Sequence, residues 1–114
     1  MPYLTIRTNA ALDRESGERL LQRASALVAE QLGKPERYVM VSLEPVTAML
    51  FAGSDAPLAY LELKSIGLQE RQVPELSAAL CSLMERETGI RQERVYIEFS
   101  SAARGMWGWN GATF

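Results

Sequence analysis

The sequence predicts an α+β fold in which two βαβ repeats, related by a pseudo-twofold axis, form a four-stranded mixed sheet. Both helices lie on one face of this sheet, and short edge strands complete it. Within 114 residues, a strand, a helix and a strand follow one another twice. The stretch Gly33-Lys34-Pro35-Glu36-Arg37-Tyr38-Val39 is echoed by Gly89-Ile90-Arg91-Gln92-Glu93-Arg94-Val95-Tyr96. Helical crossovers between parallel strands are right-handed, so two such units can pair with both helices on the same side.

The chain has the length of one domain, and the repeats divide it near its middle. We expect a single domain over residues 1–114, with one repeat at about residues 2–57 and the other at about residues 58–114. A chain of this length can bury a core of its own. Its apolar content of 47% is ordinary for a globular protein.

The first repeat opens with a strand and a helix. Residues Tyr3–Thr8 alternate in a run of β-branched and aromatic side chains, which is typical of a strand. Asp13 or Ser16 caps the helix that follows. Apolar residues continue at helical spacing as far as Gly33, and glycine suits a left-handed helix end.

Two further strands are expected in the first repeat. Tyr38–Leu43 is apolar at nearly every position, as in a buried strand, and Met49–Phe51 is expected to form a short edge strand. Because the helices cover only one face of the sheet, apolar side chains on the other face would be exposed in a single chain. An uncovered apolar face predicts a partner. A homo-oligomer that packs sheet against sheet is the simplest solution.

The second repeat follows the same order. Leu58–Ile66 alternates clearly between polar and apolar side chains and predicts a strand. Pro74 fits the first turn of a second helix, which is expected to end at Gly89, and Glu93–Phe99 is the next strand. The tail Arg104–Phe114 is rich in glycine and aromatic residues and predicts a loop with a short strand.

Composition excludes several classes of function. The net charge of −2, without a cluster of basic residues, gives no indication of nucleic-acid binding. No apolar run is long enough to cross a membrane, and no signal peptide is evident. The chain has no histidine, and its one cysteine, Cys81, allows neither an internal disulfide nor a cysteine-based zinc site. We expect no metal and no cofactor, so an enzyme would have to use carboxylates, Lys, Tyr, Arg or the terminal amine.

The start of the chain offers one such group. A small second residue such as Pro2 usually allows Met1 to be removed, which leaves a secondary amine held by the proline ring. Proline also suits the first residue of a strand, because it has no N–H to donate to the sheet. If the fold buries this amine beside a cation, the protonated form is disfavoured, and the amine can act as a base near neutral pH. On its own, however, a Met-Pro start is common.

Six short motifs follow one another in a specific order and spacing over the whole chain. They are Met1-Pro2, Gly33-Lys34-Pro35 followed by Tyr38, Phe51-Ala52-Gly53-Ser54, Lys64-Ser65-Ile66-Gly67, Arg94-Val95-Tyr96-Ile97, and Gly108-Trp109-Asn110-Gly111-Ala112-Thr113-Phe114. Together they resemble the macrophage migration inhibitory factor family, part of the tautomerase superfamily. The resemblance implies a homotrimer whose three sheets form a central barrel with the helices outside. It also implies a keto–enol tautomerase pocket at each subunit interface.

The resemblance further implies roles for individual residues. Pro2 would move a proton between carbon and oxygen of an aryl pyruvate such as phenylpyruvate or 4-hydroxyphenylpyruvate. Lys34 would bind the substrate carboxylate and favour neutral Pro2. The backbone N–H of Ile66, with Ser65 beside it, would bond the substrate oxygens. The aromatic wall of the implied pocket consists of Tyr38, Trp109 and Phe114, together with Tyr96 from the neighbouring subunit.

The chain departs from the family pattern at several positions. Trp107 stands where a smaller apolar residue is usual, which implies a tighter pocket. Glu98 replaces an Asn that can meet the far end of the substrate, and its carboxylate would repel a second anionic group there. Leu58-Ala59-Tyr60-Leu61 stands in place of a C-x-x-C pair, which excludes that thiol chemistry. The receptor motif of the animal cytokine members is also unmatched, because Ala11 or Leu12, and Val46, stand near its positions.

Two hypotheses follow. The first is an enzyme that tautomerises phenylpyruvate-like substrates through Pro2. The second is a leaderless, cytokine-like protein whose trimer binds a receptor or an intracellular partner and whose tautomerase site is partly vestigial. The broken receptor motif and the intact Pro2, Lys34, Ile66, Tyr96 and Trp109 favour the first. A purely structural trimer is the least favoured reading. A cytoplasmic location is expected, with secretion without a signal peptide as the alternative.

Overall fold

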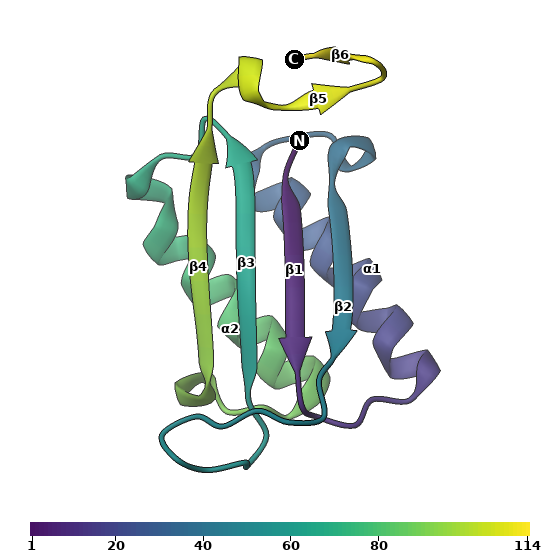
Figure 1. Ribbon diagram of the computed structural model, residues 1–114, viewed down its shortest axis with the longest axis vertical. Helices are drawn as coiled ribbons and strands as arrows, with labels where there is room; N and C mark the ends of the chain where they lie inside the picture. Colours follow the sequence, from purple (N-terminus) through teal and green to yellow (C-terminus); the bar gives the residue numbers. More distant parts are fainter.

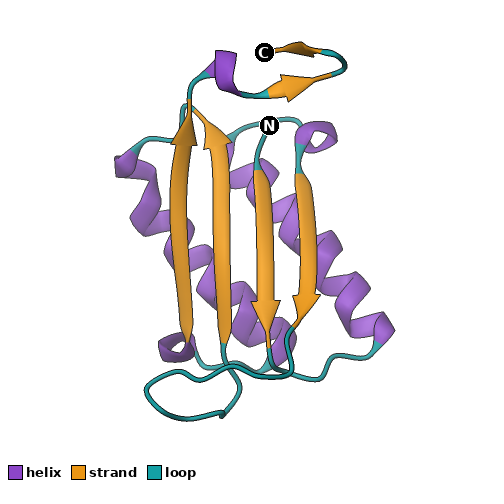
Figure 2. Ribbon diagram, viewed as in Figure 1, coloured by secondary structure: helices purple, strands orange, loops and turns teal.

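The computed structural model describes residues 1–114 and consists of two layers, a four-stranded sheet and two helices that cover one of its faces (Figures 1 and 2). The helices are α1 (Arg14–Leu32) and α2 (Val73–Thr88). The strands are β1 (Tyr3–Thr8), β2 (Met40–Pro45), β3 (Ala59–Ile66), β4 (Val95–Ala102), β5 (Gly108–Trp109) and β6 (Ala112–Thr113).

The strand order confirms the predicted pair of βαβ units. The sheet runs β2-β1-β3-β4, with β1 parallel to β2, β3 parallel to β4, and the two central strands antiparallel. Each parallel pair is joined through one helix, and exchanging the two units leaves the order unchanged. Because the units run in opposite directions, β1 starts at the end of the sheet where β3 and β4 finish (Figure 1).

The core lies between the sheet and the helices. It consists of fourteen buried residues from the two central strands, both helices, the turn after α2 and the start of β4. These are Leu4, Ile6, Leu20, Ala24, Val28, Ala59, Leu61, Leu63, Leu76, Leu80, Leu83, Met84, Ile90 and Val95. Burying a large aliphatic side chain contributes about 1.5–3 kcal/mol, so this layer holds the repeats together.

The helices begin and end at the residues that the sequence favours. Asp13 caps α1, because its side chain accepts a hydrogen bond from the backbone N–H of Ser16 at 2.7 Å. Ser16 therefore lies inside the helix, and the alternative of a Ser16 cap is wrong. Gly33 and Gly89 end the two helices in the left-handed conformation, at φ 63° and 76°.

The second strand differs from the prediction in its start and its burial. It begins at Met40, because Glu36–Tyr38 form one turn of 3₁₀ helix. It is also the edge strand of the sheet, and none of its residues is fully buried. Its apolar density reflects two side chains, Val41 and Leu43, that pack against the core; a run of hydrophobic letters alone cannot distinguish an edge strand from a central one.

The prediction of an apolar open face is wrong. Cross-strand partners project to the same side, so the pairings give three rows on this face, from β2 through β1 and β3 to β4. The rows are Met40-Tyr3-Lys64-Ser100, Ser42-Thr5-Glu62-Glu98 and Glu44-Arg7-Tyr60-Tyr96. Arg7 bridges Glu44 at 2.7 Å and Glu62 at 3.4 Å. Since this face is mostly polar, it gives no hydrophobic argument for a partner.

Met49–Phe51 is not a strand. Its only ladder contact is an isolated bridge in which Phe51 and Ser54 exchange two backbone hydrogen bonds of 3.0 Å. The two residues between them, Ala52 and Gly53, have positive φ of 53° and 73°, so the chain closes into a tight turn. The segment therefore belongs to a loop between β2 and β3.

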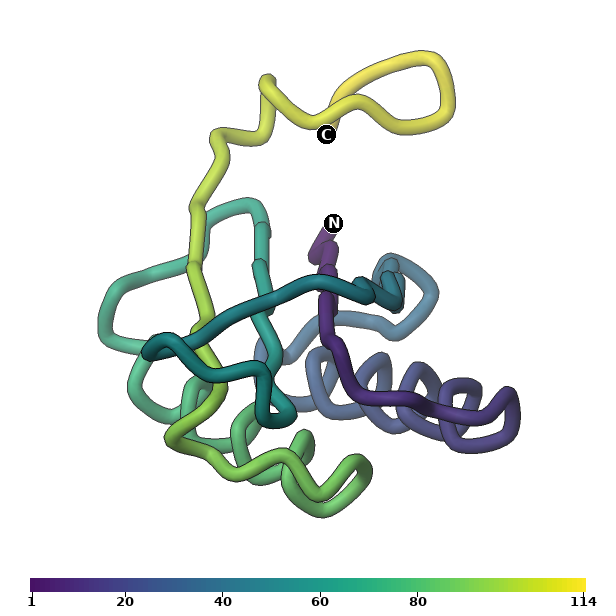
Figure 3. The backbone as a smooth tube through the Cα atoms, turned by 60° about the horizontal axis from the view of Figure 1, so that its bottom comes forward, coloured from purple at the N-terminus to yellow at the C-terminus, as the bar shows by residue number.

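The tail forms a hairpin of β5 and β6 at one end of the sheet (Figure 1). Asn110 and Gly111 make its turn, at φ 52° and 76°, which is the geometry favoured by an Asn-Gly pair. Figure 3 shows the same tail from a second direction, with both chain termini at this end of the molecule. Neither helix combines the length and hydrophobicity needed to cross a bilayer.

Candidate active site

Pro2 is buried at the start of β1, at the end of the sheet where the tail lies. Its carbonyl oxygen accepts a hydrogen bond of 2.9 Å from the backbone N–H of Met40. Its nitrogen has no proton to give, so a proline at this position leaves no unpaired donor. In this structure Met1 precedes it, and the Met1 amine donates a hydrogen bond to the carbonyl oxygen of Tyr38.

Three aromatic rings pack together beside Pro2. The ring of Tyr38 meets those of Trp109 and Phe114 edge-on, with centroids 5.9 and 5.8 Å apart. Trp109 and Phe114 stack on each other at 5.4 Å. Trp107 holds the end of the tail, since its carbonyl oxygen accepts from the Phe114 N–H at 3.2 Å. The tail therefore places aromatic side chains beside the start of the chain.

These groups line a cavity of about 280 Å³. Its lining is predominantly apolar and combines the chain start, the 3₁₀ turn before β2 and the tail. The residues are Met1, Pro2, Tyr3, Arg37, Tyr38, Val39, Met40, Trp107, Gly108, Trp109 and Phe114. A largely apolar pocket with a few polar groups is the usual form of a small-molecule site.

Lys34 is fixed at the same end of the sheet. It follows the left-handed Gly33, which ends α1 and redirects the chain. Its ammonium donates to the hydroxyl of Ser65 at 2.9 Å and to the carbonyl oxygen of Ile66 at 2.8 Å. Both acceptors lie at the end of β3, and both residues are buried. The cation therefore has two neutral partners and no carboxylate.

Burial and neighbouring cations destabilise positive charge at this end. The pKa of the Lys34 ammonium is lowered by burial and, to a smaller extent, by the positive charge of Arg104. The pKa of the Met1 amine is lowered first by burial and then by Lys34. An amine at the start of this chain is therefore neutral at lower pH than an exposed one.

Two of the predicted site residues lie elsewhere in the chain. Tyr96 stands near the start of β4, at the end of the sheet remote from Pro2, and 65% of its surface is exposed. It packs on Phe51 at a centroid distance of 4.5 Å. Glu98 lies further along β4 and accepts a hydrogen bond from the Tyr60 hydroxyl at 3.1 Å. One chain therefore assembles Pro2, Lys34 and the tail aromatics but leaves these two apart.

Three arginines at this end were not among the predicted site residues. The guanidinium of Arg37 lies over the Tyr38 ring, 4.7 Å from its centroid. Arg104 starts the 3₁₀ turn before the tail hairpin, and Arg71 follows Gly67 by four residues. In sequence they are scattered surface charges, and only the fold brings them to one end. The sequence alone therefore carries no signal that groups them with Lys34.

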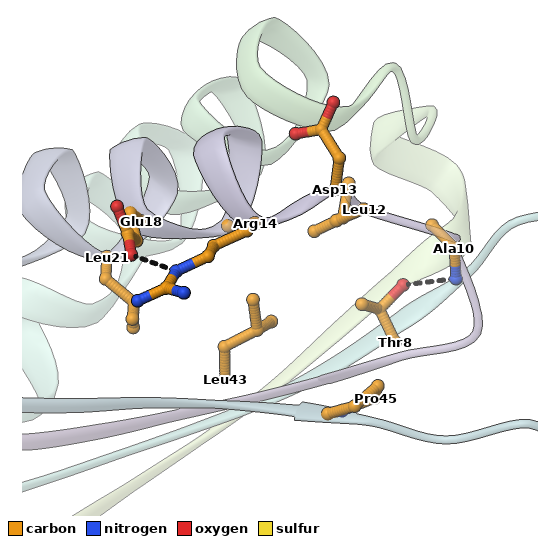
Figure 4. Close-up of a pocket in the computed structure, with 10 residues that line it drawn as sticks. Thr8, Ala10, Leu12, Asp13, Arg14, Glu18, Leu21, Leu43 and Pro45 are labelled. Carbon is orange, nitrogen blue, oxygen red and sulfur yellow. Dashed lines mark hydrogen bonds and ion pairs between the residues drawn. The ribbon is translucent and has the colours of Figure 1, made fainter.

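A second cavity of about 260 Å³ lies at the other end of the sheet, between α1 and β2 (Figure 4). Its polar groups are already partnered: Thr8 accepts from the Ala10 N–H at 3.0 Å, and Arg14 pairs with Glu18 at 3.0 Å. The Asp13 carboxylate, whose pKa is lowered by its hydrogen bonds to Ser16, serves as the helix cap. No three Asp, Glu or Cys side chains cluster in a way that would hold a metal ion. The cavity beside Pro2 is the better candidate.

Comparison with known proteins places this geometry in a family. The model of the macrophage migration inhibitory factor (MIF) family matches residues 1–114. A macrophage migration inhibitory factor homolog from Brugia malayi is 41% identical over 100% of this chain and 99% of its own length. The macrophage migration inhibitory factor of Xenopus tropicalis is 35% identical over the same shares.

Solved structures agree with this assignment. The crystal structure of a macrophage migration inhibitory factor homologue from Prochlorococcus marinus has a TM-score of 0.92 and 40% identity, covering 98% of each chain. The macrophage migration inhibitory factor structure from Trichinella spiralis has a TM-score of 0.89 and 33% identity, covering 98% of this chain and 99% of that one. The fold is therefore shared over nearly the whole chain.

Proposed function

Since the chain belongs to the macrophage migration inhibitory factor family, part of the tautomerase superfamily, we propose that it is a keto–enol tautomerase of phenylpyruvate-like acids. Its substrates would include phenylpyruvate and 4-hydroxyphenylpyruvate. The observation that carries the proposal is the buried Pro2 in an apolar, aromatic-walled cavity with the Lys34 ammonium nearby. An aryl ring fits such walls, and a carboxylate fits such a cation.

The proposed base is the amine of Pro2 after Met1 has been removed. While Met1 is present, the Pro2 nitrogen is part of an amide and has no basic lone pair. Once free, the neutral amine removes a proton from C3 of the keto acid, and the C–H electrons form a C2=C3 double bond. The prolinium then gives that proton to the oxygen on C2. One C–H bond is exchanged for one O–H bond, and no cofactor is required.

Lys34 has two parts in this scheme. Its ammonium binds the substrate carboxylate. Its charge also adds to the effect of burial in favouring the neutral form of the neighbouring amine, since burial first and Lys34 second lower the pKa of the Met1 amine. Its hydrogen bonds to Ser65 and to the carbonyl oxygen of Ile66 hold it in place. The Ile66 N–H would bond the substrate oxygens, with Ser65 beside it. The wall of Tyr38, Trp107, Trp109 and Phe114 would exclude water from the reacting carbon.

A homotrimer would complete the site. Tyr96 and Glu98 cannot reach the Pro2 of their own chain, so a neighbouring chain would have to supply them. Two observations support a contact between chains here: Tyr96 is exposed, and the depression around it is lined only by apolar residues, although the open face of the sheet is mostly polar. Met49, Leu50, Phe51, Ala52, Leu58, Ala59 and Tyr60 form this depression with Tyr96.

The cytokine-like hypothesis lacks a comparable observation. The cavity near Leu12 has three charged lining residues: Arg14 and Glu18 are paired with each other, and Asp13 caps α1. The cytoplasmic location remains a prediction, with secretion without a signal peptide as its alternative.

The test is the tautomerisation rate of 4-hydroxyphenylpyruvate for the Met1-free protein and for Pro2→Gly. Loss of a general base lowers the rate by about 10²–10⁴-fold. Pro57→Gly is the matched control, because Pro57 is exposed and lies in the loop before β3, at the other end of the sheet. Turnover that survives Pro2→Gly, or that falls equally in Pro57→Gly, would refute the proposal.

A further inference from the structure

A third cavity, of about 210 Å³, surrounds Lys34 on the side of α2. Its lining holds two cations, Lys34 and Arg71, and no acidic residue. The other lining residues are Leu32, Ser65, Ile66, Gly67, Leu68, Gln69 and Gln72. Two like charges in one small depression repel each other unless an anion lies between them. The composition of the cavity therefore points to a negatively charged ligand.

Arg71 has unused hydrogen-bonding groups. Its guanidinium makes one hydrogen bond, from Nε to the side-chain oxygen of Gln69, which orients it. Its two terminal amino groups have no partner in the protein, and no carboxylate lies within ion-pairing distance. Glu70, its neighbour in the chain, is exposed and pairs with no cation. A planar guanidinium with two free amino groups is suited to bind a carboxylate through both oxygens.

Arg104 adds a third cation. It follows β4, whose last residue Ala102 pairs with Ile66 and accepts the N–H of Gly67 at 3.2 Å. The carbonyl oxygen of Ile66 accepts a hydrogen bond from Lys34 at 2.8 Å. Arg104 therefore starts its 3₁₀ turn close to the backbone that binds Lys34. Burial and, to a smaller extent, the positive charge of Arg104 lower the pKa of Lys34. The Arg104 side chain makes neither a hydrogen bond nor an ion pair.

Most arginines elsewhere in the protein have a carboxylate or carbonyl partner, whereas Arg37 lies over the Tyr38 ring and Arg86 donates only to the Ser82 hydroxyl. Arg7, Arg19 and Arg23 are all paired with carboxylates. Arg94 is bound by backbone carbonyl oxygens. Three of the cations that have no carboxylate partner, Lys34, Arg71 and Arg104, therefore lie at one end of the sheet, in a protein whose net charge is negative.

We propose that Lys34, Arg71 and Arg104 form a dianion site, so that the preferred substrates are enolisable 2-oxo acids with a second carboxylate. This inference rests on the proposed tautomerase function and specifies its substrate class. Lys34 and Arg104 bind the carboxylate next to the reacting carbonyl, and Arg71 binds the second one. A singly charged aryl pyruvate neutralises only part of this cluster. The repulsion expected from Glu98 concerns the far end of a substrate, away from these cations.

The first test compares kcat/KM for oxaloacetate, which has two carboxylates, with that for phenylpyruvate, which has one. Arg71→Gln and Arg104→Gln are each expected to lower the ratio about tenfold, the effect of losing one charged hydrogen bond. Arg71→Lys should restore part of it. Arg91→Gln, which removes an exposed arginine paired with Glu93, is the matched control and should leave the ratio unchanged. An unchanged ratio in both site variants would overturn the proposal.

A second measurement separates this inference from the proposed function. Malonate and acetate differ by one carboxylate, and their binding to the wild-type protein can be measured by calorimetry without any turnover. We expect malonate to bind at least about tenfold more tightly than acetate, and Arg71→Gln to remove that preference. Equal affinities would refute the dianion site. A malonate preference in a protein whose turnover is insensitive to Pro2→Gly would support the site and refute the tautomerase mechanism.

Discussion

The two βαβ repeats have the same backbone conformation between helix and strand, but the side chains in this segment have different roles in the two repeats. Gly33 and Gly89 each end a helix in the left-handed conformation, and each is followed three residues later by one turn of 3₁₀ helix. Lys34 therefore corresponds to Ile90. Lys34 extends to the end of β3 and stays uncompensated, whereas Ile90 is completely buried in the core.

The last residue of each 3₁₀ turn shows the same division. Tyr38 supplies a ring to the aromatic wall, while the equivalent Arg94 holds the loop before β3. Its guanidinium donates to the carbonyl oxygens of Phe51, Ser54 and Ala56 at 2.8, 3.0 and 2.8 Å. One copy of the turn builds a pocket, and the other fastens a loop. The same backbone turn therefore contributes to the candidate active site in the first repeat and to loop packing in the second.

The largest expected effect of a substitution on stability lies in the second repeat. Ile90→Ala removes a fully buried side chain and should lower the free energy of unfolding by about 2–5 kcal/mol. The rate of 4-hydroxyphenylpyruvate turnover per folded protein should stay within about twofold. Denaturant unfolding at fixed protein concentration, with the assay on the same sample, measures both. A variant with wild-type stability and lost turnover would reverse the assigned roles.

Lys34→Gln should give the opposite result. Losing a charged hydrogen bond to the substrate lowers kcat/KM by about 10–100-fold, while unfolding changes little because Lys34 has only two neutral partners. Its charge also lowers the pKa of the terminal amine. Because only the neutral amine is a base, removing that charge raises its pKa. The acid limb of the pH profile should then move to higher pH, and a limb that stays in place would contradict the role of Lys34.

Arg94→Gln should have a smaller effect on stability. It removes hydrogen bonds to the loop of residues 51–57, at a cost of about 1–2 kcal/mol for a partly exposed site. Hydrogen exchange at the Phe51 and Ser54 amides should accelerate, since these two residues are bonded to each other across the turn. Amides in α1 should be unaffected at native conditions. Unchanged exchange in the loop would show that Arg94 does not fasten it.

The two helix ends should respond alike, because there the repeats do not differ. Alanine is strained by about 1–2 kcal/mol in the left-handed conformation, and nothing within 4 Å would meet a Cβ at Gly33 or Gly89. Gly33→Ala and Gly89→Ala should therefore each reduce the free energy of unfolding by that amount. A difference between the two above about 1 kcal/mol would show that the turns are not equivalent.

Periodicity and end signals predicted most of the fold. The alternation in Leu58–Ile66, the Asp13 cap and the two glycine helix ends are local effects, and each appears in the structure. The edge position of β2 and the polar open face were missed, because both depend on which strand neighbours which. Met49–Phe51 resembles a strand in composition, but the tight turn at Ala52 and Gly53 pairs Phe51 with Ser54 instead of with a strand of the sheet.

The site divides in the same way. Pro2, Lys34 and the tail aromatics were predicted from their motifs, and the structure brings them to one end. Arg71 and Arg104 were missed, because their approach to Lys34 depends on how β3 and β4 end together. The expected contributions of Tyr96 and Glu98 from a second chain remain predictions.

The catalytic role of Pro2 is tested most directly by blocking its amine. A preparation with Met1 removed is compared with one that carries a short N-terminal extension, after intact mass has established which chain start each contains. We expect rapid tautomerisation of 4-hydroxyphenylpyruvate by the Met1-free protein and a loss of about 10²–10⁴-fold in the extended one. Equal rates in the two would place the base elsewhere and contradict the catalytic role of Pro2.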